Sequence, residues 1–566
     1  MTRRLLSSRK TLAAMLAAGL LSAGLAACSS GGSGGSSGSS GSGGSGATLT
    51  MESSPETTVP DNFNPFLSQQ AVYNMGPTGL VYEPLVQFDL ANPTVSYPWL
   101  ATKYAWSNGG KAITFTIRQG VKWSDGQPLT AQDVAFTYNL VKQYADINLD
   151  GLNISSVSTS GDTVTVNFPT PQYMNLEYIA GEAILPQHIW SKVGDPGKYT
   201  DPTPVGTGPY KLGSFSSQGI TMTANPSYWQ SVPVKKVFFP AYSSNTTATA
   251  ALFSGQVTWT GNFISGVQQK FVQSDPAHHL AYEAADSSNA IIPNLTKWPT
   301  NQLEVRQAIS AAIDRSQIGS EGEDGLESGL TNATGISPEF QAWAGPVSSM
   351  TQSPSADPAA AKQILQSHGW TLKNGFFYKG GKELSVTIMD PADYTDYAAD
   401  DALIAQQLKA AGINATFDGT TDDAWNSAVG SGNFQLTLHW SNGGINPYPL
   451  YDNWLDDSLL SGSAGFTGDN EQLHDPAIQT ALQKVRGDQT TTEQAQDLQP
   501  IEQYVAKQLP VIPTTTAAEW SEINATDFTG WPSQSNPYDS GQPSGTNNGP
   551  GTGTNEVVLL HLKPVS

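Results

Sequence analysis

The chain has a single cysteine, Cys28, among its 566 residues, so no disulfide bond can form within it. Basic residues are also scarce, because 27 Lys and Arg stand against 49 Asp and Glu and the formal net charge is −22. Nucleic-acid-binding proteins need a basic footprint, and this composition excludes that class. Stability must come from a hydrophobic core, which a chain of this length can bury in two or three domains.

Histidines and long apolar runs are equally rare. The seven histidines are scattered, and the adjacent pair His278-His279 is not spaced to bind one metal ion. There is no H-E-x-x-H motif and no cysteine pair, so we expect no metal site and no cofactor. After the N-terminal segment no apolar run reaches the roughly 18 residues that cross a bilayer, and the body is expected to be soluble.

Cys28 follows a basic segment, an apolar segment and the small residues L-A-A. This order is typical of a secretory signal peptide, and a cysteine at its cleavage point is the bacterial lipobox pattern. We expect removal of residues 1–27, acylation of Cys28 and anchoring through two acyl chains. The Ser/Gly-rich residues 28–46 then form a flexible tether with an extended reach of roughly 60 Å.

Beyond the tether, helices and strands are mixed. Residues 113–118 and 163–168 alternate as strands do, and residues 130–142 form a predicted helix that Thr130 caps. Residues 303–318 carry a helical apolar stripe. A further helix starts at Asp357-Pro358 and stops at Gly369.

Strands and helices alternate in the segment 384–440. The strands are predicted at 384–389, 413–417 and 434–440, and the helices at 395–411 and 422–429. This order indicates a parallel sheet, whose ligands bind beyond the carboxyl ends of its strands. Trp440 and the loop that follows it lie at such an end. Further on, residues 530–554 read as loop, and residues 556–562 are predicted to be a strand that completes a domain begun early in the chain.

Several segments resemble the family 5 extracellular solute-binding proteins, the peptide- and nickel-type receptors of ABC importers. The longest match is W-S-D-G-Q-P-L-T-A-Q-D-V at residues 123–134. Shorter ones occur in family order and are Y-E-P-L-V at 82–86, G-T-G-P-Y at 206–210, N-P-S-Y-W at 225–229, L-F-S-G-Q at 252–256 and V-R-Q-A-I-S at 305–310. The Asp-Gly turn in the long block favours a structural role for it.

The resemblance implies an α/β, two-lobed periplasmic-binding-protein-like fold of type II, cluster C, with an extra subdomain inserted in lobe I. Two crossover strands would join the lobes, and the ligand would be enclosed between them. The expected organisation is lobe I at 47–88, 205–285 and 515–566, the inserted subdomain at 89–204 and lobe II at 286–514.

Two groups of residues are candidates for ligand contact. Aromatic faces stack on sugar rings or bury peptide side chains, and neutral polar groups beside them suit an uncharged, hydroxyl-rich ligand. The first group is Trp425, Trp440, Ser441, Asn442 and Asn446, and the second is Trp259, Asn262 and Phe263. The second group follows residues 255–258, which are predicted to be a strand leading to the hinge.

The resemblance also bears on ligand charge. In oligopeptide-binding relatives, the segment corresponding to residues 439–447 carries an aspartate that pairs with the terminal ammonium of the peptide. That position here is Gly443, and a basic residue of some relatives falls on Thr437. A buried ligand charge needs a partner, and Asp452 or Asp456 is left as a substitute.

We therefore expect a monomeric, non-enzymatic, lipid-anchored receptor outside the cell membrane, which delivers an oligopeptide or an oligosaccharide to an ABC permease and ATPase complex. Both ligand classes stay open. A secreted polysaccharide-active hydrolase is the alternative from another class, although no pair of carboxylates stands out by its spacing. A chaperone- or sensor-like surface lipoprotein is a third possibility.

Overall fold

A computed structural model describes residues 47–53, 55–67, 71–89, 92–340, 343, 350–459, 468–543 and 554–565. The predicted signal peptide, the tether and Cys28 lie outside the described residues. Residues 43–566 belong to one compact unit. Within the described stretches, no helix combines the length and the apolar character that crossing a bilayer requires.

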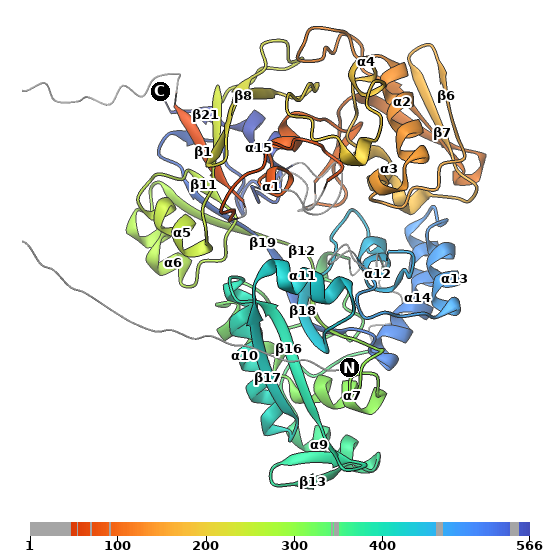
Figure 1. Ribbon diagram of the computed structural model, residues 1–566, viewed down its shortest axis with the longest axis vertical. Helices are drawn as coiled ribbons and strands as arrows, with labels where there is room; N and C mark the ends of the chain where they lie inside the picture. The colour runs from red at the N-terminus through yellow and green to blue at the C-terminus, as the bar shows by residue number, and fades with distance from the viewer. Residues whose placement is uncertain are drawn as a thin grey trace, which may run out of the picture. The chain divides into compact units, whose positions relative to one another are not determined.

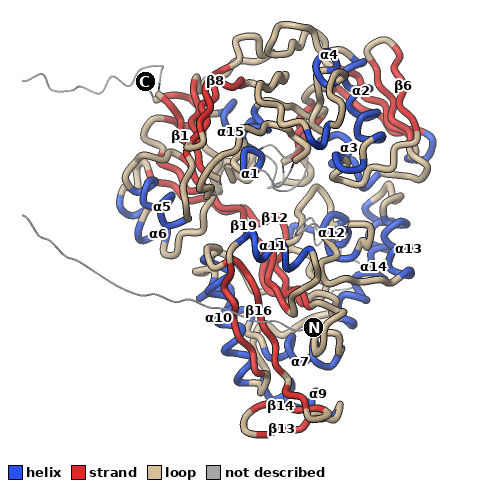
Figure 2. Tube along the Cα trace, viewed as in Figure 1, coloured by secondary structure: helices blue, strands red, loops and turns tan. Residues whose placement is uncertain are grey.

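A ten-stranded mixed sheet runs through this unit (Figures 1 and 2). Its middle strands β12 and β19 are the longest, and the pairs β16–β17 and β16–β18 are parallel, which confirms the parallel arrangement predicted for residues 384–440. The strand order is β17 (Asn414–Thr420), β16 (Ser385–Pro391), β18 (Leu436–Trp440), β12 (His279–Pro293), β19 (Ile512–Asn524), β11 (Trp259–Thr260), β1 (Thr48–Glu52), β10 (Lys236–Pro240), β9 (Gly219–Ala224) and β8 (Tyr210–Ser216).

β12 and β19 join the two halves of this sheet. They pair antiparallel from His279↔Asn524 to Ile291↔Ile512, and Figure 1 shows them running side by side. β18 pairs with β12 on one side, and β11 pairs with β19 on the other. The predicted lobe boundaries at 285/286 and 514/515 fall inside these two strands. The boundaries themselves stay a prediction.

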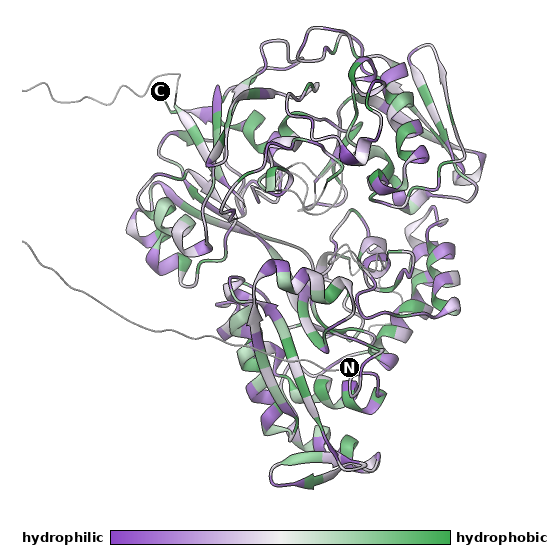
Figure 3. Ribbon diagram, viewed as in Figure 1, coloured by the Kyte–Doolittle hydropathy of each residue, from purple (hydrophilic) through white to green (hydrophobic). Residues whose placement is uncertain are grey.

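The hydrophobic cores follow the same division. The largest cluster contains Leu49, Phe115, Phe239 and Leu559, so early residues, the inserted segment and the C-terminal tail share one core. Two further clusters are built almost entirely from residues between 290 and 512. Figure 3 shows helices such as α10 (Thr395–Ala410) carrying both hydrophobic and hydrophilic residues, as expected where one face covers a core.

The inserted segment has its own antiparallel sheet, with the order β4 (Ala101–Ser107), β5 (Ala112–Ile117), β7 (Thr163–Asn167) and β6 (Ser156–Ser160). The two predicted strands at 113–118 and 163–168 are confirmed as β5 and β7. The capping box of Thr130 and Asp133 starts α2 (Ala131–Gln143), also as predicted. Trp123 is fully buried, which agrees with a structural role for the long motif.

The predicted helix at 357–369 is confirmed as α9, because the Asp357 carboxylate accepts hydrogen bonds from the N–H groups of Ala359 and Ala360. The other α-helices are α1 (Ala71–Asn74), α3 (Leu176–Gly181), α4 (Gln187–Trp190), α5 (Asn245–Phe253), α6 (Val267–Lys270), α7 (Leu303–Ala312), α8 (Arg315–Gln317), α9 (Pro358–Ser367), α11 (Asp422–Gly430), α12 (Tyr448–Leu455), α13 (Pro476–Val485), α14 (Thr491–Gln508) and α15 (Thr554–His561).

The single helix predicted at 303–318 is wrong, because α7 ends at Ala312. Ile313 has extended backbone angles, and Asp314 caps a new short helix by accepting from the Gln317 N–H. The Arg315 side chain turns inward and donates to the Pro513 carbonyl oxygen at 2.8 Å. A tertiary contact of a buried cation therefore interrupts a pattern that is locally helical.

The strand predicted at 556–562 is also wrong, because this segment forms α15. Its Glu556 carboxylate accepts from Gln87 at 2.7 Å, and its residues Val558 and Leu559 are buried in the lobe I core. A short apolar run does not distinguish a strand from a buried helix. The tail packs in the core cluster that contains the early residue Leu49, and its place in lobe I stays a prediction. Of the predicted loop, residues 530–543 are described without a helix or strand, and its last residue, Thr554, begins α15.

A buried carboxylate in lobe II leads to a first prediction. Glu502 on α14 is fully buried, neither carboxylate oxygen has a hydrogen-bond partner among the described residues, and burial raises its pKa to about 8. The raised pKa stabilises the fold fully below about pH 4.3, and this contribution is lost as the pH rises toward 8.

Glu502→Gln should therefore raise the free energy of unfolding by about 4 to 5 kcal/mol at pH 8 and leave it unchanged near pH 4. Denaturant unfolding at the two pH values measures this difference, with Asp162→Asn at an exposed turn as the control. An equal effect of Glu502→Gln at both pH values would contradict the prediction.

Candidate functional site

Trp440 ends β18 and stands in a cluster of aromatic rings. Its ring stacks on Tyr397 at a centroid distance of 6.2 Å, and Tyr394 lies tilted against it at 6.4 Å. The His439 ring is 3.6 Å away, centroid to centroid. Trp440 keeps part of its surface exposed, while Tyr397 and His439 are buried. The cluster thus holds one accessible aromatic plate in a fixed orientation at the carboxyl end of a strand.

Trp425, the other tryptophan of the first group, lies on α11 with only 2% of its surface exposed. Its indole N–H donates to Thr437 at 2.9 Å, and Thr437 in turn donates to the Asp390 carboxylate at 2.7 Å. The ring is parallel to that of His439 at 5.1 Å. In this arrangement Trp425 packs against His439, which in turn contacts Trp440. Direct contact of Trp425 with a ligand stays a prediction.

Burial also determines the charge of His439 and Asp390, which lie next to these rings. The pKa of His439 is lowered to about 3, because burial disfavours the imidazolium. The pKa of Asp390 is raised to about 7, again chiefly by burial, against the hydrogen bonds it accepts. The imidazole is neutral at physiological pH, so the aromatic cluster presents no positive charge to a ligand.

The polar side chains after Trp440 form hydrogen bonds with other parts of the protein. Ser441 donates to the Ser288 carbonyl oxygen at 2.8 Å, which links β18 to β12. Asn446 donates to the Met174 carbonyl oxygen at 3.3 Å and accepts from the Tyr448 N–H at 2.9 Å. Asn442 forms a side-chain hydrogen bond with Tyr178. These groups therefore position the loop, and their role toward a ligand stays a prediction.

The second predicted group lies at the end of β11, separated from β18 in the sheet by β19 and β12. The strand predicted at 255–258 is wrong: Gly255 has φ +74°, the left-handed conformation that follows many helices, and ends α5. The strand is the two-residue β11 that follows. Trp259 is fully buried and donates to the Gly541 carbonyl oxygen at 2.8 Å, so it packs inside lobe I.

Asn262 and Phe263 follow β11 at a small acidic and aromatic patch. Asn262 donates to Glu52, a residue with 1% of its surface exposed, and burial raises the Glu52 pKa to about 6. Phe263 meets the edge of Trp520 on β19 at 5.5 Å. Ligand contact by these residues stays a prediction, and Trp520 adds an aromatic ring that sequence patterns did not single out.

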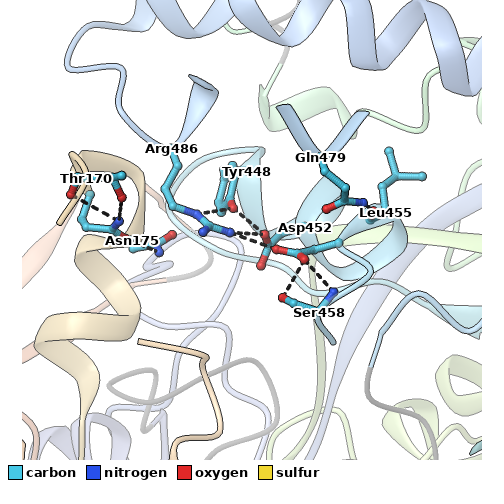
Figure 4. Close-up of polar contacts among 10 residues, drawn as sticks. Thr170, Asn175, Tyr448, Asp452, Leu455, Ser458, Gln479 and Arg486 are labelled. Carbon is cyan, nitrogen blue, oxygen red and sulfur yellow. Dashed lines mark hydrogen bonds and ion pairs between the residues drawn. The ribbon is translucent and has the colours of Figure 1, made fainter. Parts of the chain in front are cut away.

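The aspartates that were left as possible partners for a ligand ammonium are already engaged. Arg486 donates to Asp452 at 3.2 Å and to Asp456 at 3.0 Å, and Tyr448 joins the same cluster through Arg486 at 2.7 Å (Figure 4). With glycine at position 443 and threonine at 437, the described loop offers no charged side chain at the two positions that the resemblance compares.

The described residues contain no group of three histidine, cysteine, aspartate or glutamate side chains that is arranged to hold a metal ion. Of the adjacent pair, His278 contacts Asp275 at 2.9 Å, and His279 stacks on Phe271 at 4.1 Å. Their partners differ, as expected for neighbours in sequence.

Sequence reasoning missed Tyr394 and Tyr397, the rings against which Trp440 packs. Both stand where α10 begins, directly after β16, and so at the strand end at which open parallel sheets bind ligands. Their spacing of three places them on one helix face. The signal was thus present, but the contact between α10 and β18 is needed to connect them with Trp440.

Comparison with known proteins places this geometry in context. Residues 96–459 match the family model described as bacterial extracellular solute-binding proteins, family 5, middle. The nickel-binding periplasmic protein of Escherichia coli K12 is 27% identical over 52% of this chain and 57% of its own length. Protein XP55 of Streptomyces lividans is 29% identical over 56% of this chain and 57% of its own. The alignments thus span less than two thirds of these curated relatives.

Solved structures match over a longer range. A mannohexaose-bound periplasmic oligopeptide-binding protein of Thermotoga maritima superimposes with a TM-score of 0.81 and 25% identity, over 91% of this chain and 98% of that one. The architecture is therefore the mixed α/β fold of the periplasmic oligopeptide-binding proteins, as expected.

Proposed function

Because this chain belongs to the bacterial extracellular solute-binding proteins of family 5, a family of binding proteins rather than enzymes, we propose that it captures a neutral oligosaccharide outside the cell membrane and delivers it to an ABC permease. The observation that carries the choice of ligand is the set of groups around Trp440: an accessible aromatic plate backed by tyrosines, a neutral imidazole and a loop of amides and hydroxyls.

Charge supports an oligosaccharide over a peptide. A peptide with free ends brings an ammonium and a carboxylate, and each needs a partner when it is buried. Position 443 is glycine, and Asp452 and Asp456 are already held by Arg486. The similar Thermotoga protein, which is described as an oligopeptide-binding protein, carries mannohexaose in its structure. Oligopeptide remains the second candidate, since that description names it.

Binding measurements decide between the two. Isothermal titration calorimetry of the purified protein with mannohexaose and with a matched hexapeptide should give saturable binding of the sugar and none of the peptide. Chromatography of the sugar after incubation should recover it uncleaved. Saturable peptide binding without sugar binding would overturn the choice of ligand, and cleaved sugar would return the hydrolase to consideration.

Lipid anchoring is a separate part of this proposal. It rests on the L-A-A-C sequence that ends at Cys28 and on the Ser/Gly-rich residues that follow it. Metabolic labelling with an alkyne-bearing fatty acid should mark the native chain but not Cys28→Ala, which should appear in the soluble fraction. Equal labelling of the two chains would exclude Cys28 as the lipid acceptor.

A further inference from the structure

The inserted subdomain contacts lobe II through a short, well-bonded segment. The Glu177 carboxylate on α3 accepts from the Ile445 N–H at 2.9 Å. Close by, the Met174 N–H donates to the Arg486 carbonyl oxygen at 3.3 Å, and Met174 packs in a lobe II core cluster. The structure therefore shows the two parts docked on one another.

This contact is rich in carboxylates. Glu177 has 1% of its surface exposed, and its Oε1 has no hydrogen-bond partner among the described residues. Asp150 of the inserted subdomain acts by its charge on both Glu177 and Glu182, and Asp452 of lobe II acts on Asp150. Arg486 is the cation of this contact, and it is held by Asp452, Asp456 and Tyr448.

The electrostatic consequence is a set of raised pKa values. Burial, opposed by the Ile445 hydrogen bond and assisted by repulsion from Asp150, raises the pKa of Glu177 to about 8. Burial and repulsion from Asp452 raise the pKa of Asp150 to about 7. The tyrosines that face these groups, Tyr178 and Tyr448, stay protonated because their pKa values are raised well above the ordinary value.

Carboxylates of the two lobes also come within electrostatic range of one another near the other candidate residues. Glu56 follows β1 in lobe I, and the charges of Asp422 and Asp423, in the first turn of α11 in lobe II, act on it. The groups that act on Glu56 are these two carboxylates and the Asn74 amide, and burial followed by their repulsion raises its pKa to about 7. Tyr394 donates to Asp422 at 2.9 Å.

We infer that docking of lobe I on lobe II takes up protons, so that a mildly acidic medium favours the docked form and tightens ligand binding. The inference deepens the proposed function, on which it rests for the link between docking and ligand. The buried Glu177 carboxylate and its hydrogen bond across the contact carry it, and the charge repulsion at Glu56 supports it.

The direction of the pH effect on docking follows from the linkage between proton binding and docking. When the lobes separate, Glu177, Asp150 and Glu56 regain water, and their pKa values return toward about 4. Between about pH 4.5 and 8 the docked form therefore binds more protons than the separated form. Docking is most favourable at the acidic end of this range, and the advantage is lost as the pH rises through about 7 to 8.

Distance measurements on the ligand-free protein test this directly. Spin labels at Ser160→Cys on β6 and Thr480→Cys on α13, both exposed, report the separation across the contact in a Cys28→Ser background. Pulsed electron–electron double resonance should show that the population with the shorter distance between the two labels grows from pH 8.0 to pH 5.0. Distance distributions that are identical at the two pH values would overturn the inference.

Matched variants distinguish titration of the carboxylates at the contact between the lobes from titration of carboxylates elsewhere in the protein. Glu177→Gln, Asp150→Asn and Glu56→Gln should each reduce the pH response, and the triple variant should abolish it. If variants at Glu177 do not fold, the pair Asp150→Asn and Glu56→Gln should still reduce the response. Glu502→Gln, which neutralises a buried carboxylate inside lobe II, should leave the response intact. A response that persists in full in the triple variant would assign it to other groups and overturn the inference.

Titration with mannohexaose links docking to binding. The dissociation constant should be about a hundredfold lower at pH 5.5 than at pH 7.5, with an uptake of about one proton measured in buffers of different ionisation enthalpy. Binding without proton uptake would overturn the inference and leave the proposed function standing. Absence of sugar binding at both pH values would overturn the choice of ligand, while the distances in the ligand-free protein would still decide the inference.

Discussion

Replacing Trp440 with alanine should weaken mannohexaose binding about a hundredfold. The ring is the accessible face of a cluster in which Tyr397 stacks behind it at 6.2 Å, so the protein itself sets its orientation. Loss of such an anchor costs roughly 2 to 3 kcal/mol of binding free energy. Calorimetric titration at pH 6 measures the change, and circular dichroism establishes that the variant is folded.

Two control variants distinguish stacking of Trp440 on the ligand from the role of Trp425 in stabilising the fold. Trp440→Phe keeps an aromatic face and should stay within about tenfold of the native affinity. Trp425→Phe removes the N–H that holds Thr437 at 2.9 Å, so it should lower the free energy of unfolding by about 1 kcal/mol with little effect on affinity. Native affinity in Trp440→Ala would remove this residue from the site.

Replacing Arg486 with methionine should lower the free energy of unfolding by about 4 kcal/mol at pH 8. The guanidinium is the shared partner of Asp452 and Asp456, and its side chain is 23% exposed. Removing one member of a mostly buried ion cluster leaves charges without a partner, which costs more than the cluster contributes as a whole. Denaturant unfolding measures the difference.

The pH dependence of this loss of stability tests whether its origin is electrostatic. Burial holds the pKa of Asp452 at about 6 even with Arg486 present, so the aspartate can take up a proton in mild acid. The cost of Arg486→Met should therefore shrink from pH 8 to pH 5. Adding Asp452→Asn should recover more than 1 kcal/mol at pH 8. A cost that is the same at both pH values and in both backgrounds would contradict an electrostatic origin.

Local patterns predicted much of the fold because they depend on a few neighbouring residues. Asp357 followed by Pro358 starts α9, since a carboxylate and a proline both suit the first helical turn wherever the helix lies. The alternation of β16, α10, β17, α11 and β18 was likewise apparent from short apolar periods, and it placed Trp440 at the end of a strand.

Other segments depended on distant partners. The 556–562 run became a helix because its apolar residues fill a core made by the first part of the chain. The helix at 303 ended early because Arg315 reaches a carbonyl oxygen of β19, nearly 200 residues away. Neither outcome can be read from neighbours, since the deciding contacts join residues far apart in sequence.

By itself the sequence determined the acidic character of the chain, the L-A-A-C sequence from which a lipobox at Cys28 is predicted, the family resemblance and the position of Trp440 at a strand end. Only the tertiary structure decided that Tyr394 and Tyr397 back this ring, that Arg486 already holds the neighbouring aspartates, and that the Glu177 carboxylate bonds to lobe II. The physical reason is that composition and periodicity act locally, whereas stacking, ion pairing and desolvation depend on which distant surfaces are brought within a few ångströms.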